Sequence, residues 1–77
     1  MPAKQPSWED RAKRFLKAEL KRADVSYKEL AGRLEKQGLD ETEASIANKL
    51  SRGTFAATFF LASLMAINCE GIRMEDL

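Results

Sequence analysis

The fold is decided by residues 26–54, which read SYKELAGRLEKQGLDETEASIANKLSRGT. Ser26 and Glu29 form a capping-box pattern, in which the hydroxyl caps the first helical turn and the carboxylate reaches back to the cap amide. From Tyr27 onward, apolar residues recur at helical spacing until Gly38, which supplies a left-handed stop. This pattern predicts a helix of about three turns that begins at Tyr27.

A second, shorter helix is predicted directly after the first. Asp40 and Glu43 form another capping-box pattern at its start. Ile46 and Leu50 then face inward, and Gly53 ends the run. At about 100° per residue, the outward positions carry hydrogen-bonding side chains. These outward residues are Thr42, Ser45, Asn48, Lys49 and Arg52.

The N-terminal part predicts a longer amphipathic helix from Trp8 to Ala23. Ser7 stands at the cap position, and acidic residues follow it in the first turn, where they complement the helix dipole. Trp8 and Phe15 fall on the apolar side and are expected in the core. The opposite side carries Lys13, Arg14, Lys17 and Lys21. Such a row is typical of a solvated face, and it is also able to follow a phosphate backbone or to bind an acidic protein.

The C-terminal part predicts a central helix that begins at Phe55 and ends at Ile67, because this segment is apolar on nearly all sides. Thr54 is placed to cap it. A domain this small has difficulty burying every face of such a helix, so one face is available for a partner or a second copy. A short last helical turn is expected after residue 71, with apolar packing candidates at Ile72, Met74 and Leu77.

Composition bounds the classes of function. The 77 residues include 13 Lys and Arg, 12 Asp and Glu, one Cys and no His, which indicates one small domain over 1–77 with a flexible stretch at 1–6. Zinc sites of the common types, intrachain disulfides and histidine-dependent triads are excluded. Glu41 and Glu43 are the best carboxylate pair for catalysis, but no site organises them. We therefore expect no enzyme activity, metal or cofactor.

The location and the charge distribution are also informative. No signal-peptide pattern is visible, and residues 55–67 are too short to span a bilayer, so we expect a cytoplasmic protein without a membrane segment. Residues 1–38 hold ten basic and six acidic side chains, a net of +4, whereas residues 39–77 hold three and six, a net of −3. A basic N-terminal half is compatible with a phosphate-facing surface.

Two capped helices in succession, the second with polar outer positions, have the layout of a helix-turn-helix. Through residues 26–31, 45–53, 64–67 and 74–77 the sequence resembles the lambda-repressor-like, Cro/C1-type DNA-binding domains. This resemblance runs from residue 25 to 77 and implies an all-α, compact four-helix domain with a short fifth C-terminal helix and a helix-turn-helix unit at 26–53. The sequence departs from the Cro/C1 pattern in two places. The connection between Leu34 and Thr42 is longer, and one extra residue lies between Ile46 and Gly53.

The run ETEASIANKLSRGTF at residues 41–55 is similar to a bacterial family of small uncharacterised proteins with no assigned activity. The helix-turn-helix layout implies a small transcriptional regulator that reads the major groove with the helix from Thr42 to Arg52. Candidate base contacts are Thr42, Ser45, Asn48 and Lys49, since such side chains hydrogen-bond base edges. Candidate phosphate contacts are Ser26, Lys28, Arg52 and Thr54. Ordinary helix exposure and capping explain these residues about as well.

Two functions therefore remain open at this point. The first is binding of double-stranded DNA, with a homodimer through the apolar helix that begins at Phe55 reading two half-sites. The second is a helical protein-interaction adaptor that binds no nucleic acid, which the near-neutral net charge and the acidic entry to the second motif helix favour. A steep salt dependence of binding would distinguish the first from the second.

Overall fold

The structure, a computed structural model, describes residues 6–77. Four α-helices and one turn of 3-10 helix follow in order: α1 (Trp8–Ala23), α2 (Tyr27–Lys36), α3 (Glu43–Arg52), α4 (Ala57–Ala66) and the 3-10 turn (Met74–Asp76). No strand occurs among residues 6–77, so the all-α prediction is confirmed. The predicted flexible stretch at 1–6 falls, up to residue 5, outside the described residues.

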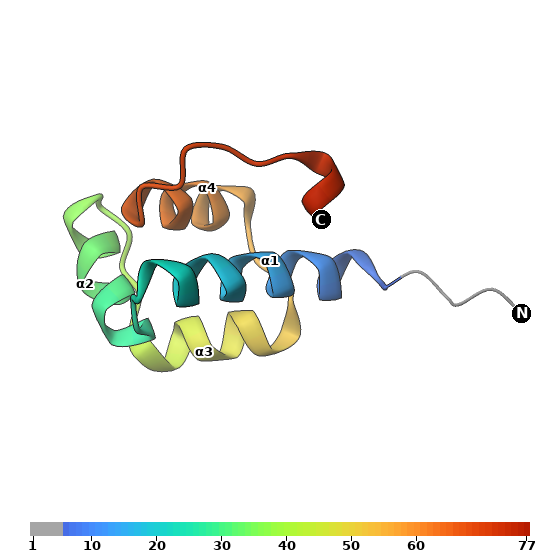
Figure 1. The fold of residues 1–77 in the computed structure, drawn as a ribbon. Coiled ribbons are helices and arrows are strands. Elements are labelled where there is room, and N and C mark those ends of the chain that lie inside the picture. The colour runs from blue at the N-terminus through green and yellow to red at the C-terminus, as the bar shows by residue number, and fades with distance from the viewer. Residues whose placement is uncertain (1–5) are drawn as a thin grey trace, which may run out of the picture.

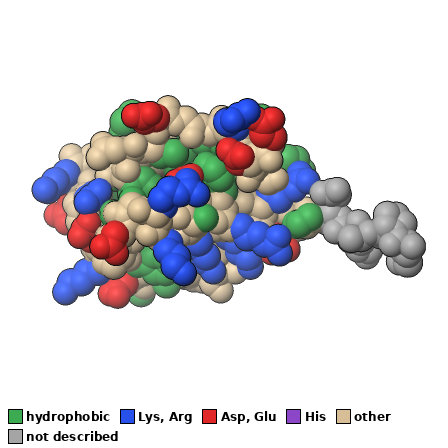
Figure 2. Space-filling model, viewed as in Figure 1, with side chains coloured by type: hydrophobic (Ala, Val, Ile, Leu, Met, Phe, Trp, Pro, Cys, Tyr) green, Lys and Arg blue, Asp and Glu red, His purple; other side chains and the backbone are tan. Residues whose placement is uncertain are grey.

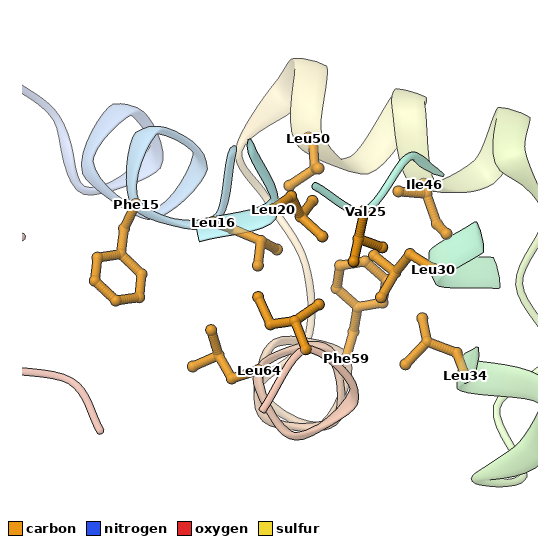
Figure 3. Packing of buried hydrophobic residues seen from close by; sticks show 11 residues of the cluster. Phe15, Leu16, Leu20, Val25, Leu30, Leu34, Ile46, Leu50, Phe59 and Leu64 are labelled. Carbon is orange, nitrogen blue, oxygen red and sulfur yellow. The ribbon is translucent and has the colours of Figure 1, made fainter. Parts of the chain in front are cut away.

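The helices enclose one core. In Figure 1, α1 runs between α3 and α4, and α2 closes one end, where it contacts both of them. Figure 3 shows Ile46 and Leu50 of α3 and Phe59 and Leu64 of α4 directed into the same space from opposite sides. The apolar side chains with essentially no exposure are Leu16, Leu30, Leu34, Ile46 and Leu50. The predicted inward face of each motif helix is thereby confirmed.

The first two helices begin where their caps predict. The hydroxyl of Ser7 accepts a hydrogen bond from the Asp10 amide at 3.1 Å, and the hydroxyl of Ser26 accepts one from the Glu29 amide at 3.1 Å. The other bond of the capping box predicted for α2, from the Ser26 amide to the Glu29 carboxylate, does not form. The Glu29 carboxylate instead accepts a hydrogen bond from Arg33 Nη2 at 2.7 Å. Serine caps alone therefore define these two helix starts.

Helix α3 begins two residues later than the Asp40 cap predicts. Thr42 is the N-cap, and its hydroxyl accepts from the Ser45 amide at 3.0 Å while Ser45 Oγ accepts from the Thr42 amide at 2.8 Å. This reciprocal pair satisfies two backbone donors at once, which Asp40 and Glu43 do not. Glu41 consequently lies in the connection before the helix, free to turn back along α3.

Helix α4 also begins later than expected, at Ala57, and Thr54 does not cap it. The N-cap is Ala56, which has no side chain able to accept a hydrogen bond. The ring of Phe55, just before the cap, instead stacks on Phe60 with centroids 5.9 Å apart. This contact joins the residue before the cap to the fourth helical residue, the arrangement called a hydrophobic staple. An apolar contact thus replaces the predicted hydroxyl cap.

The expectation that Trp8 belongs to the core is wrong. Trp8 is the first residue of α1, just before the point where Glu9 meets the end of α3, and its side chain is 62% exposed. The Arg11 guanidinium lies 4.6 Å from the centroid of the indole ring, a cation–π contact that covers part of it. Phe15, two turns further along, is buried as predicted. Only the later turns of α1 have partners on both sides.

The last segment is shorter than the predicted fifth helix. Met74–Asp76 form a single 3-10 turn. Ile72 and Leu77 pack against the core as predicted, whereas Met74 is 72% exposed. Two side chains from the end of α2 bond to backbone carbonyls of α4. Arg33 Nη1 donates to the Ala66 carbonyl at 2.8 Å, and Nε2 of Gln37, the C-cap of α2, donates to the Ala62 carbonyl at 3.2 Å. These bonds tie the second half of α4 to the end of α2.

Among residues 6–77, the buried hydroxyl of Ser63 lacks a hydrogen-bond partner, and its removal is expected to stabilise the fold. Ser63 in α4 has no exposed surface, and its Oγ atom is unpaired. Replacing Ser63 by alanine should raise the free energy of unfolding by about 1 kcal/mol, since an unsatisfied buried hydroxyl costs roughly 1–3 kcal/mol. Urea unfolding followed by circular dichroism measures this change. As a control, Ser51→Ala on exposed α3 surface should gain only a few tenths, about the difference in helix propensity. A loss of stability in Ser63→Ala would contradict the assignment.

Candidate nucleic-acid interface

The solvent-facing side of α3 differs in part from the predicted one. Ile46 and Leu50 turn to the core, and Asn48 lies on the opposite side of the helix. The exposed residues within α3 beyond its first residue are Ala44, Ala47, Asn48, Ser51 and Arg52. Ser45 and Lys49 are half-buried on one flank. Of the four predicted base contacts, Asn48 is therefore the one with an outward position inside the helix.

Ser45 and Lys49 take part in an internal polar cluster around Glu41. The ammonium group of Lys49 forms an ion pair with the Glu41 carboxylate, and Ser45 Oγ donates to Glu41 Oε1 at 2.7 Å. Lys49 Nζ also lies 4.9 Å from the centroid of the Phe59 ring in α4. The Glu41 side chain is only 8% exposed. The cluster fastens the connection before α3 to the middle of that helix.

This cluster shifts the acidity of Glu41. Burial of its carboxylate acts to raise the pKa, but the hydrogen bonds from Lys49 and Ser45, together with the positive charge of Lys49, outweigh burial and lower the pKa below its ordinary value. The carboxylate is thus held in its charged form by groups of the same molecule. A spacing of four residues between Glu41, Ser45 and Lys49 is the signal from which sequence reasoning could have found the cluster.

The predicted phosphate contacts fall in two groups, one at the C-terminal end of α3 and one at the start of α2. Arg52 and Thr54 flank Gly53 at its C-terminal end, and both are exposed. Lys28 is exposed at the start of α2, near the opposite end of the α1–α3 pair (Figure 1). The hydroxyl of Ser26 is occupied as the cap of α2. Three of the four predicted side chains therefore project into solvent without a capping role.

The solvent-facing side of α1 is strongly basic. Figure 2 shows Lys and Arg side chains gathered over α1 and towards α3. The row is made by Arg11, Lys13, Arg14, Lys17, Lys21 and Arg22. Lys13 Nζ donates to the Ser51 carbonyl at 3.4 Å, so this row adjoins the end of α3. Two members also face acids of α1, with Lys13 3.5 Å from Asp10 and Arg22 2.7 Å from Glu19.

A close backbone approach fixes how α1 and α3 meet. Gly53 ends α3 with φ of 73°, in the left-handed region. A Cβ atom added there would collide with the Glu9 carbonyl, whose carbon would lie 2.8 Å away. Gly53 thus lets the end of α3 touch the first turn of α1, and it holds Arg52 beside the basic row. Sequence reasoning identified Gly53 as a helix stop but not as this contact.

The carboxylates considered for catalysis do not converge. Glu41 is paired with Lys49, whereas Glu43 is exposed at the first position of α3. Within residues 6–77 no group of three or more His, Cys, Asp or Glu side chains is arranged to hold a metal ion. In the same part of the chain no helix has the length and apolar character that crossing a membrane requires.

Comparison with known proteins places the chain in a family. Searches of the curated proteins and of the solved structures gave no significant match. A family model described as "Domain of unknown function (DUF6471)" matches residues 8–72, from the start of α1 to the segment before the 3-10 turn. This match agrees with the predicted similarity to an uncharacterised family, while the finer Cro/C1 resemblance stays a prediction. Since the model covers most of its length, the chain belongs to the DUF6471 family of domains of unknown function.

Proposed function

We propose that this domain binds double-stranded DNA as a small non-catalytic transcriptional regulator, with α3 in the major groove and the basic row of α1 on the phosphates. The observation that carries the proposal is the adjacency of two surfaces. The outward side of α3, with Asn48 and Arg52, adjoins the cations of α1 through the Lys13 to Ser51 bond. Base edges and backbone would thereby be contacted from one side of the molecule.

The pairing of α2 with α3 supports a lambda-repressor-like helix-turn-helix. The two helices pack against each other and are joined by residues 37–42. Around Asn48, the exposed side of α3 carries the small residues Ala44, Ala47 and Ser51, which let the helix axis come close to the groove floor. The Asn48 amide is able to make two hydrogen bonds with adenine, and alanine methyl groups suit contact with thymine methyls.

Charges around α3 support phosphate contact. Lys13, Lys17 and Lys21 follow one another at four-residue spacing, roughly 6 Å apart along the helix axis. That spacing is comparable in scale with the charges of a DNA strand. The ion pair of Glu41 with Lys49 also compensates a carboxylate that would otherwise repel phosphates near the start of α3. Arg52 adds an exposed cation at the end of α3, and Lys28 adds one in the first turn of α2.

The test is selection of genomic fragments by the purified protein, with bound fragments sequenced and retention followed across a salt series. We expect enrichment of a shared motif and affinity that falls steeply with salt, as phosphate neutralisation requires. Absence of retention at low salt would overturn the proposal. It would then favour the adaptor role for the same helical scaffold.

Variants separate base contacts from phosphate contacts on the enriched motif. Asn48→Ala should weaken binding to that motif by about 1–3 kcal/mol and leave the salt slope unchanged. The double change Lys17→Gln with Lys21→Gln should weaken binding to all sequences and reduce the slope of log K against log salt by roughly 0.9 per lost phosphate contact. Lys36→Gln, an exposed cation at the far end of α2, is the matched control and should leave both unchanged.

A further inference from the structure

An apolar groove lies on the side of the molecule formed by α4 and the chain that follows it. Its volume is about 470 Å³. The lining residues are Leu61, Leu64, Met65, Cys69, Gly71 and Ile72, none of which is charged. Two of them stand out at the surface, Leu61 with 61% and Met65 with 71% exposure. Two adjacent exposed apolar side chains beside an uncharged groove form a candidate contact surface.

The charge distribution selects what can cover this groove. Residues 53–69 contain no Asp, Glu, Lys or Arg, although the chain has 25 such residues in all. Burying the outer face of α4 therefore desolvates no charged side chain from this segment. Two copies that met through their α1 faces would instead bring two rows of cations together, which costs energy. For contact between copies, electrostatics favours α4.

We propose that this groove, with Leu61 and Met65, is a self-association surface that pairs with the same surface of a second copy of this chain. Exposed charges of both signs adjoin the groove, Glu70 and Arg73, only three positions apart. In a two-fold pairing each surface meets itself, so the Glu70 carboxylate of one copy can approach the Arg73 guanidinium of the other in both directions. Within one chain Arg73 pairs with the exposed Glu75, which leaves it able to exchange partners.

The proposal is independent of DNA binding, because the groove lies on α4 and uses none of the residues proposed to contact DNA. Its test compares two methionines of equal exposure. Met65 lines the groove, whereas Met74, with 72% exposure, does not. Sedimentation equilibrium over a wide range of protein concentration should show a monomer–dimer equilibrium for the wild type and for Met74→Glu. Met65→Glu should weaken dimerisation by roughly 100-fold, since symmetry buries the new carboxylate twice.

The single cysteine supplies a second readout. Cys69 lines the groove and is half-buried in the monomer. Its alkylation by iodoacetamide should slow as the concentration of wild-type protein or of Met74→Glu rises, but not for Met65→Glu. Circular dichroism identifies any variant that fails to fold, and Leu61→Lys then replaces it. A wild type that stays monomeric at every concentration, or a dimer that survives in folded Met65→Glu, would overturn the proposal. DNA binding by Met65→Glu is measured in a separate assay, so that failure of the self-association proposal and failure of the DNA-binding proposal can be distinguished.

Discussion

Substituting Gly53 with alanine is expected to destabilise the domain by about 2–5 kcal/mol. The left-handed backbone at φ of 73° costs an alanine about 1–2 kcal/mol. The new methyl group would also press on the backbone of Glu9, and overpacking of this kind adds about 1–3 kcal/mol. A domain of this size has only about 4–12 kcal/mol of stability. Urea unfolding followed by circular dichroism at 222 nm, a wavelength chosen for helix content, measures the loss.

The chain contains its own control for this prediction. Gly38 also has a left-handed backbone, with φ of 85°, but a Cβ atom there meets nothing within 4 Å. Gly38→Ala should therefore cost only the backbone term, about 1–2 kcal/mol. The difference between the two variants isolates the approach of α3 to α1. Equal losses for Gly38→Ala and Gly53→Ala would show that the two helices do not meet as closely as described.

Replacing Lys49 by methionine is expected to cost about 2–4 kcal/mol at neutral pH. The change removes the ion-pair partner of a carboxylate that is 8% exposed, and a charge left alone in such a place is strongly unfavourable. Methionine keeps an unbranched apolar stem at this position, but it also removes the ammonium that lies over the Phe59 ring, so the loss includes that cation–π contact. Glu41→Gln should cost less, because the Lys49 side chain is 30% exposed and its ammonium can turn to water. Chemical unfolding at pH 7 compares the two variants.

The same substitution should reverse the contribution of Glu41 to pH dependence. In the wild type its lowered pKa adds stability that is fully present above the ordinary value of 4.5 and is lost as the pH falls through the lowered pKa. Without Lys49, burial outweighs the one remaining hydrogen bond from Ser45 and raises the pKa of Glu41. Lys49→Met should then recover part of its lost stability on acidification, as the carboxylate takes up a proton. Parallel pH profiles for wild type and variant would contradict the ion pair.

The parts of the fold that sequence predicted well are those set by neighbours in the chain. Ser7 and Ser26 each cap an amide three residues ahead, so α1 and α2 begin where the pattern places them. The start of α3 was missed because Asp40 and Thr42 are both good caps. The choice depends on Ser45 and on the Glu41 to Lys49 pair, which spans eight residues and closes only when the connection is folded.

The other misses have tertiary causes. Thr54 is a sound local cap, but the stacking of Phe55 on Phe60 fixes the start of α4 instead. Trp8 fits the apolar stripe of α1, but the exposure of its side chain depends on where α3 and α4 end. Hydrophobic periodicity within α1 gives no information on those ends. Among the candidate site residues, Asn48 and Arg52 project outward as predicted. Ser45 and Lys49, which were predicted to face outward, are half-buried on a flank of α3 and are held by Glu41, a residue outside that helix.

The exposed position of Trp8 makes the molecule its own fluorescent sensor. It is the only tryptophan of the chain and lies at the start of the cationic helix, partly covered by Arg11. Its emission reports the polarity around the first turn of α1 and not that of the core. Trp8 fluorescence therefore reports local unfolding at the N-terminal end of α1, whereas circular dichroism reports unfolding of the whole domain. A macromolecule that binds the cations of α1 lies close to Trp8 and should change its fluorescence emission, so binding can be followed without an attached label.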